Sequence, residues 1–552
     1  MSALPKSATI VIVGSGAGGG SAAWRLASRG HNVLLLEAGP RFEPERDYNQ
    51  DKSNWETPFP TKEGSLSPYT VAPLQKLTDE TSDIRSWSKL NGPYVTGGTR
   101  ANFGYHHVRA VGGSSLSFTG EAHRINPYSM SMKTRFGVAS DWPVSYDELE
   151  PYWVEAENLV GVAGSNEHPF CWRSSDYPLP AHRYSYASTV LATGAKKIGL
   201  TPVPNSLAVL SEPYDDRPNC NYCGGCQRGC QLSDKGSVDV TYLRHAERTG
   251  RCTVVSNVEV LKLLHSRDKV TGLLISHEGK IEKISTEVLI LAAGAIQTPR
   301  ILLNSASTGA PDGLANDSGQ VGKNLMETLL TTSTGLHPKQ LGSHRGLPVN
   351  WVAWDYNAPD SIEGVIGGAR FAPAMAESDL VGPVAYATRV VDGWGASHRK
   401  RMEDTFGKVL SIAGIGESLP NENTYVELGA EKDRHGLPKA NIHSFLDDMA
   451  HQRLRFMMKT CRQIIASSGC NGTIEEFSSA DAFSSTHVFG TCRMGNNPDT
   501  SVVDSSGRSH RWRNLLIADG SVFPSSGGGE SPGLTIQALA MRSIDMLIRK
   551  GI

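Results

Sequence analysis

The sequence of 552 residues has no long apolar run and almost no net charge. No stretch approaches the roughly 18 consecutive apolar residues that span a bilayer, so an integral membrane protein is not expected. A formal net charge of −2 gives no electrostatic reason to expect binding to nucleic acid or to an anionic membrane. Internal repeats and low-complexity segments are absent as well. The chain is too long for a single hydrophobic core, and two or more domains are therefore expected.

A secretion signal is also missing from the beginning of the sequence. Residues 1–7 contain no charged segment followed by an apolar one, so the sequence predicts no signal peptide of its own. The protein is then expected to be cytoplasmic, or periplasmic if it is exported together with a partner. The 57 glycines and 30 prolines favour a loop-rich α/β protein over a helical bundle.

What is present begins with a glycine-rich turn between two apolar strands near the N-terminus. Residues 9–13 read as a buried parallel strand, and residues 14–19 (GSGAGG) follow as a turn that opens a helix. A second apolar strand at 33–36 ends in Glu37. Strand, glycine turn, helix, second strand and terminal acid all stand in the expected order. This pattern predicts a dinucleotide-binding βαβ unit.

Each residue type in this unit has a physical reason. Gly14 permits the tight turn, Gly16 lets the backbone approach a pyrophosphate, and Gly19 lets the helix pack close to the strand. The N-terminus of the helix faces the negative charge of the pyrophosphate. Glu37 is placed to accept hydrogen bonds from an adenosine ribose.

Glycine-rich turns and apolar strands occur again later in the sequence, after long insertions. A second glycine-rich run occupies residues 109–115, an apolar strand is predicted at 288–291 with a helix from 298 to 305, and another strand at 514–520 ends near an acid. A final helix is expected from about 534 to 549. The nucleotide-binding domain is therefore predicted to be discontinuous in the sequence.

Five blocks in this order resemble the glucose-methanol-choline (GMC) oxidoreductase family: residues 9–37, 109–115, 294–299, 487–495 and 519–535. The stretch DWPVSYDELEPYW from Asp141 and a cluster of cysteines look most similar to bacterial gluconate, fructose and FAD-glucose dehydrogenase flavoproteins. The resemblance implies an α/β fold in which a Rossmann-like FAD-binding domain carries an inserted α+β substrate-binding domain. It implies bound FAD as the cofactor.

The resemblance also implies domain boundaries. The FAD-binding domain would comprise residues 1–130, 215–335 and 480–552. The substrate-binding domain and its lid segments would comprise residues 131–214 and 336–479.

Further cofactor contacts follow from the same likeness. Gly112, Gly113 and Ser114 would lie along the isoalloxazine or the pyrophosphate. Asp519 and Gly520 would close on the ribityl region, and the backbone of Val258 would meet the adenine. Some family members attach flavin covalently through a histidine just after the second glycine-rich run. Residues 116–118 (LSF) contain none, so noncovalent FAD is predicted.

His487 is the candidate catalytic base. Oxidation of an alcohol needs a base of near-neutral pKa, and histidine suits this task. By resemblance, the block HVFGTCRMG beginning at His487 places this histidine at the family's base position. The alternative is that His487 is a structural residue of a glycine-rich loop.

The second catalytic position departs from the family pattern. Where Asn followed by Pro is common, the sequence has Ser531 before Pro532, with Glu530 beside it. Serine can still donate a hydrogen bond to the substrate oxygen, with a shorter reach. Glu530 either orients His487 or binds a second hydroxyl. Alternatively, Ser531 and Glu530 only shape the loop.

Four of the nine cysteines lie close together, at Cys220, Cys223, Cys226 and Cys230. By resemblance, Cys220, Cys226 and Cys230 match the three ligands of a [3Fe–4S] cluster. A structural zinc, disulfides or reduced packing thiols are the alternatives. His106, His107 and His123 have no further residue at the spacing that metal ligands need. They are interpreted as structural or substrate-facing.

The leading functional expectation is FAD-dependent oxidation of a CH–OH group in a sugar, sugar acid, glycoside or polyol. The alternatives are an alcohol oxidase that uses O₂ on an aromatic, aliphatic or sterol alcohol, and a non-redox flavoprotein lyase. A small subunit or a cytochrome is a candidate electron-accepting partner.

Overall fold

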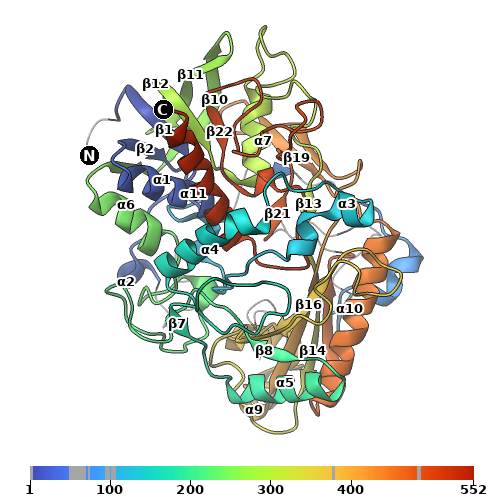
Figure 1. The fold of residues 1–552 in the computed structure, drawn as a ribbon. Helices are drawn as coiled ribbons and strands as arrows, with labels where there is room; N and C mark the ends of the chain where they lie inside the picture. Colours follow the sequence, from blue (N-terminus) through green and yellow to red (C-terminus); the bar gives the residue numbers. More distant parts are fainter. Residues whose placement is uncertain are drawn as a thin grey trace.

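The structure is a computed structural model that describes residues 4–48, 70–71, 75–93, 100, 107–375, 380–481 and 486–551. Two β-sheets form the centres of two lobes (Figure 1). This arrangement confirms the predicted α/β class.

The first sheet has seven strands in the order β10-β11-β12-β1-β2-β9, with β22 paired to β12. Its strands are β1 (Ser7–Val13), β2 (Val33–Leu36), β9 (Cys252–Val255), β10 (Val258–Ser266), β11 (Lys269–His277), β12 (Lys280–Leu291) and β22 (Leu515–Ile517). The strands β9, β2, β1, the last part of β12 and β22 run parallel. The strands predicted at 9–13, 33–36, 288–291 and 514–520 all belong to this parallel part.

Apolar residues on both faces hold the parallel part together. Val11 pairs with Leu34 on one side and with Leu289 on the other, and all three side chains are buried. The helices α1 (Ala17–Ser28) and α11 (Gly533–Arg549) pack against each other beside the sheet (Figure 1). Strands buried on both faces need continuous apolar runs, which the sequence supplies here.

The second sheet is antiparallel, with eight strands in the order β5-β4-β20-β14-β17-β16-β15-β8. Their bounds are β4 (Trp87–Ser88), β5 (Gly92–Pro93), β8 (Pro202–Pro204), β14 (Leu329–Leu336), β15 (Trp351–Ala353), β16 (Ala369–Pro373), β17 (Val409–Gly416) and β20 (Thr473–Ser478). The helices α5 (Tyr186–Lys197) and α10 (Asp448–Ser467) pack against β17, and α10 also packs against β14.

Shorter elements connect the two sheets. They include α4 (Tyr146–Val160), α7 (Gly294–Asn304), β13 (Met326–Glu327) paired with β21 (Val488–Phe489), and β18 (Tyr425–Lys432) paired with β19 (Pro438–His443). The helix α7 begins four residues before the predicted start at 298. The strands at 87–93 join the second sheet, and β14 runs across the predicted boundary at 335; the domain boundaries themselves stay a prediction. Within the described ranges, no helix is both long and apolar enough to cross a bilayer.

Candidate active site

Three parallel strands end at the same edge of the first sheet and begin the site. Gly14 follows β1, Gly294 opens α7 after β12, and Asp519 follows β22. The ends are tied together, since Gly14 N donates to Leu36 O and Ala518 N donates to Leu291 O, at 2.8 Å each. Ligands of parallel α/β sheets bind outside the carboxyl ends of the strands. The sequence therefore brings its glycine turn and its late acidic residue to one place.

The glycine turn leaves room at one position only. A Cβ atom on Gly14 would stand 2.4 Å from Ala292 O, and one on Gly19 would stand 1.9 Å from Gly14 O. A Cβ atom on Gly16 would meet nothing closer than the Cα atom of Gly113, at 4.0 Å. Gly14 and Gly19 therefore permit backbone contact, whereas Gly16 borders open space.

The second glycine-rich run lies directly on this turn. The Ser15 hydroxyl accepts a hydrogen bond from Gly112 N at 3.1 Å and donates to Glu37 Oε2 at 2.6 Å. Gly112 and Gly113 both have positive φ, which L side chains rarely adopt. The 3₁₀ turn at Gly113–Leu116 follows, and Ser114 Oγ accepts a hydrogen bond from Val108 N at 3.3 Å.

Glu37 is buried at the end of β2, as predicted. Its carboxylate accepts hydrogen bonds from Ser15 N and Gly39 N, at 3.0 and 2.9 Å, besides the Ser15 hydroxyl. Burial raises the pKa of this carboxyl above its ordinary value. A carboxylate has about four acceptor positions, so one is left for a ribose hydroxyl. Val258 lies next to Glu37, with its N–H on Glu37 O at 2.9 Å.

Asp519 joins β22 to α7. Its Oδ2 accepts hydrogen bonds from Gly294 N at 2.9 Å and from the Thr298 hydroxyl at 2.6 Å, and its Oδ1 accepts from Ser521 N at 2.9 Å. Burial raises the pKa of this carboxyl. Gly520 is also buried, with its carbonyl on Gly490 N.

This set of residues fits a bound dinucleotide. The helix α1 begins at Ala17 with no side-chain cap and no acidic residue in its first turn, so its N-terminus favours an anion. The open space at Gly16 lies beside that N-terminus. Glu37 retains acceptor capacity at the ribose end. FAD bound here would supply hydride acceptance at its flavin ring.

His487 stands immediately before β21. Its carbonyl accepts a hydrogen bond from Thr328 N at 3.1 Å, and Gly490 N donates to Gly520 O at 3.2 Å. The side chain is half-buried, and its Nδ1 atom has no hydrogen-bond partner among the described residues. Burial lowers the pKa of His487 to about 4; Glu121 opposes this change and Arg370 adds to it. The imidazole is therefore neutral near pH 7 and able to accept a proton.

Thr491, four residues after His487, supplies a hydrogen-bond donor that α7 lacks. Pro299 has no N–H and cannot donate to the carbonyl of Ala295 one turn earlier. The Thr491 hydroxyl donates to that buried carbonyl at 2.6 Å. The helix consequently continues through Pro299 and begins at Gly294. The block around His487 is thus fixed to the helix that also holds Asp519.

Glu530 does not form a hydrogen bond with His487 among the described contacts. Its Oε1 accepts from Asn126 N at 3.0 Å and from Asn357 Nδ2 at 2.8 Å, and its Oε2 has no partner within the described residues. Burial raises its pKa. These contacts agree with the alternative in which Glu530 shapes the loop.

Ser531 is held through its backbone. Its N–H donates to His123 Nδ1 at 3.0 Å, and its side chain is buried. His123 links Ser531 to the surroundings of His487: it accepts the Ser531 N–H, and the charge of His487 contributes to the lowered pKa of His123. The catalytic roles of His487, Ser531 and Glu530 stay predictions.

Sequence reasoning missed a buried charge pair in this neighbourhood. Arg370, on β16, donates from two guanidinium nitrogens to both oxygens of Glu121, at 2.7 Å each. Burial opposes ionisation of Glu121, but Arg370 lowers its pKa to about 2. His123 contacts Trp354, with its ring edge-on to the indole, and Arg370 lies over the same indole ring. The only sequence signal is the mostly polar segment 121–126 (EAHRIN), which follows shortly after the second glycine-rich segment.

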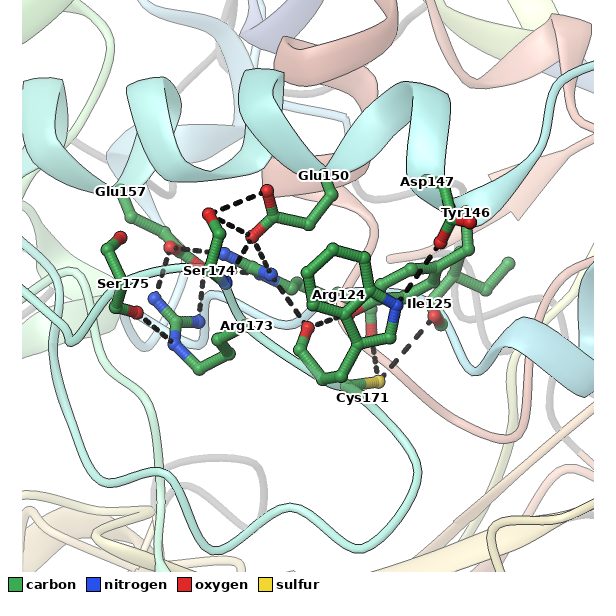
Figure 2. A network of polar contacts seen from close by, with 11 residues as sticks. Arg124, Ile125, Tyr146, Asp147, Glu150, Glu157, Cys171, Arg173, Ser174 and Ser175 are labelled. Atoms are coloured by element: carbon green, nitrogen blue, oxygen red, sulfur yellow. Dashed lines mark hydrogen bonds and ion pairs between the residues drawn. The ribbon is translucent and has the colours of Figure 1, made fainter.

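The opposite side of this polar run is anchored to α4 (Figure 2). Arg124 donates to both oxygens of Glu157 at 2.9 Å, and Arg173 also binds Glu157. Arg124 reaches Glu150 as well, at 3.1 Å. The Arg124 and Glu157 side chains are each only 1% exposed. Segment 121–126 is therefore fixed between α4 and the loop that contains Ser531.

The cysteine cluster shows no metal-binding arrangement. Throughout the described ranges, no group of three or more His, Cys, Asp or Glu side chains could hold a metal ion, and all nine cysteines are free. Burial raises the pKa of Cys226 to about 12 and that of Cys230 to about 11. Cys220 and Cys226 lie in a small apolar cluster. Cys220 and Cys226 are therefore buried packing residues, whereas Cys223 is exposed. His106 lies outside the described residues.

Comparison with known proteins identifies the same family and the same dinucleotide-binding unit. Models described as GMC oxidoreductase match residues 94–329 and 420–540, and a model described as NAD(P)-binding Rossmann-like domain matches residues 12–42.

Two curated relatives cover almost the whole chain. The fructose dehydrogenase large subunit of Gluconobacter japonicus is 27% identical, covering 98% of each chain. The 2-methyl-1,2-propanediol dehydrogenase of Mycolicibacterium austroafricanum is 26% identical, covering 98% of this chain and 95% of the relative. A solved structure of pyridoxine 4-oxidase from Mesorbium loti has the same fold, with a TM-score of 0.66 and 18% identity over 98% of this chain and 99% of that one.

The family models and the solved structure agree with the predicted two-part fold built on a Rossmann-like unit. With its glycine turn, His487 block and C-terminal segment assembled at one edge of the sheet, the chain belongs to the GMC oxidoreductase family.

Proposed function

We propose that this oxidoreductase uses FAD to oxidise a CH–OH group of a sugar, sugar acid, glycoside or polyol to a carbonyl. The position of His487 carries the proposal. Its imidazole is neutral, and its Nδ1 has no partner among the residues that the structure describes. It belongs to the segment bonded to Gly520, at the edge where the dinucleotide site is built. The relatives named for fructose and for a propanediol support hydroxyl-rich substrates.

In this proposal, His487 accepts the proton of the substrate hydroxyl. FAD held by the glycine turn and Glu37 would supply the acceptor for the hydride on the carbon that bears this hydroxyl. Ser531 donates a hydrogen bond that holds the substrate oxygen. The buried Glu121–Arg370 pair has no net charge, so it leaves the imidazole neutral. Removal of the proton and of the hydride from one CH–OH group yields the carbonyl.

Anaerobic reduction of the bound flavin tests the proposal. A panel of sugars, glycosides, polyols and aryl alcohols is mixed with the protein without oxygen, and loss of the yellow absorbance is recorded. His487→Ala should keep FAD but lose the bleaching, whereas His398→Ala, at a half-buried position, should behave like wild type. Bleaching at the normal rate in His487→Ala rejects the base assignment.

The same protein and substrate panel distinguish the dehydrogenase from the oxidase and the non-redox lyase. An oxidase would consume O₂ at the rate of substrate oxidation, whereas a dehydrogenase would need an artificial dye or a cytochrome. A non-redox lyase would turn over without any bleaching. The words "large subunit" in the name of one relative support a search for a small partner subunit, which bears on whether the protein acts in the cytoplasm or is co-exported to the periplasm.

Two finer points on cofactors belong to the proposal. FAD is expected to be noncovalent, so acid precipitation should leave the flavin in the supernatant. The [3Fe–4S] alternative at Cys220, Cys226 and Cys230 gains no support from the arrangement of the thiols. Iron analysis and absorbance beyond the flavin bands decide it.

A further inference from the structure

A closed chain of hydrogen bonds surrounds the loop that contains Ser531. Ser531 N–H donates to His123 Nδ1 at 3.0 Å, and His123 Nε2 donates to Asn205 Oδ1 at 2.8 Å. Asn205 Nδ2 then donates to Glu121 Oε1 at 2.9 Å. These contacts fix which ring nitrogen of His123 carries the proton. The tautomer is Nε2–H, with Nδ1 free to accept.

The chain returns to the loop through the buried ion pair. Arg370 binds both oxygens of Glu121 and also donates from Nε to Gly529 O at 2.6 Å. Gly529 is two residues before Ser531, so the backbone closes the ring of contacts. Every donor nitrogen of the Arg370 fork and both nitrogens of His123 have partners. A buried polar network that is fully satisfied rigidifies the structure around it.

His123 is the residue of this closed hydrogen-bond network that directly binds Ser531. Its side chain is only 2% exposed, and burial lowers its pKa to about 4, so the ring stays neutral. A protonated ring would present a second N–H to the Ser531 N–H and break the contact. Its edge-on contact with Trp354, at 5.0 Å between ring centres, fixes the ring orientation further.

We propose that His123 is a positioning residue that acts through the backbone of Ser531, holding the Ser531 hydroxyl at the substrate oxygen. The proposal rests on the proposed function, because Ser531 matters only if an alcohol is oxidised beside it. His123 itself need not contact the substrate. The Glu121–Arg370 pair supports the same loop from its Gly529 end.

Two near-isosteric variants separate the two contacts of the ring. The amide oxygen of Asn reaches the position of His Nδ1, so His123→Asn retains the acceptor for Ser531. The Gln amide reaches the position of Nε2, so His123→Gln retains the contact with Asn205 and loses the acceptor. Both variants remove the ring from Trp354, which makes each the control for the other.

The readout is the rate of anaerobic flavin reduction, together with FAD content. His123→Asn should stay within about threefold of wild type, and His123→Gln should lose about 10- to 100-fold in rate with little change in apparent KM. In a Ser531→Ala background, His123→Gln should cost little more, because both changes remove one effect. Equal losses in the Asn and Gln variants, or full additivity with Ser531→Ala, would overturn the proposal.

Hydrogen exchange gives a measurement that needs neither substrate nor variant. The amide of Ser531 should be strongly protected in the wild-type holoenzyme, and rapid exchange there would also overturn the proposal. If no alcohol bleaches the wild-type flavin, the proposed function fails instead, and the exchange result still decides whether His123 holds the loop.

Discussion

A Cβ atom on Gly113 would stand 2.8 Å from the Cα atom of Gly16, so the two glycine-rich segments touch through backbone alone. Nearly a hundred residues separate these glycines in the sequence. A Cβ atom on Gly16 itself would lie 4.0 Å from the Cα atom of Gly113, at an ordinary contact distance, so an alanine is sterically allowed there.

Gly16→Ala should therefore lower FAD content while the apoprotein stays folded. The added methyl group has space in the protein but occupies the space that the pyrophosphate needs. The flavin-to-protein absorbance ratio and the thermal midpoint of the apoprotein measure the two effects separately. A variant with full FAD content would place the pyrophosphate elsewhere.

Gly113→Ala should lose both FAD and stability. Its φ of +58° strains an alanine, and its methyl group would clash with Gly16. Gly382→Ala is the matched control, because the φ of Gly382 lies outside the left-handed region. A Cβ atom added there would meet no described atom within 4 Å. The control should melt at the wild-type temperature.

Thr491→Val should destabilise the fold by about 1–3 kcal/mol, because it leaves the buried carbonyl of Ala295 without a donor. Thr491→Ser retains the hydroxyl and should lose much less. Denaturant unfolding of both variants checks the difference. A loss in Thr491→Ser as large as that in Thr491→Val would contradict a dominant role for the hydroxyl.

Arg124→Gln should lower the free energy of unfolding by about 3–5 kcal/mol, because the buried Glu157 carboxylate loses one of its two charged partners. The exposed pair Arg399–Glu403 offers a control. Arg399→Gln should change the free energy of unfolding by less than about 1 kcal/mol. Similar losses in the two variants would contradict the view that Arg124 anchors segment 121–126.

The rate of flavin reduction should not fall between pH 8 and pH 6. The base His487 has a pKa lowered from 6.5 to about 4, so it stays neutral over this range. Because its folded pKa lies below the unfolded value, its contribution to stability is full above pH 6.5 and is lost as the pH falls towards 4. Stopped-flow reduction at constant ionic strength checks the profile. A midpoint near 6.5 would mean that His487 is solvated.

The sequence predicted the elements whose signals are local. The strands at 9–13 and 33–36, the turn at 14–19 and Glu37 combine periodicity with glycine spacing inside one short stretch of sequence. Their pairing with the distant strands β12 and β9 adds nothing to that local signal. The start of α7 was placed too late because Pro299 reads as a helix boundary. Its compensating donor, Thr491, comes from a segment far away in the chain, which no local pattern reveals.

The surroundings of Ser531 could not be predicted for the same reason. The contact between His123 and Ser531 spans 408 positions, and that between Glu121 and Arg370 spans 249. In the sequence, His123 is one of 17 histidines and has no motif of its own. Only the folded chain shows that it accepts a hydrogen bond from the loop beside the candidate base.

The position of β1 has a consequence for synthesis. Val11 pairs with both Leu34 and Leu289, and β22, on the other side of β12, begins only at Leu515. A nascent chain leaving the ribosome must therefore keep an apolar edge of β1 uncovered until β12 is made, and an edge of β12 uncovered until β22 is made. Pairings this distant fold slowly and expose aggregation-prone strands. The yield of folded protein should accordingly depend on how well these strand edges are protected during translation.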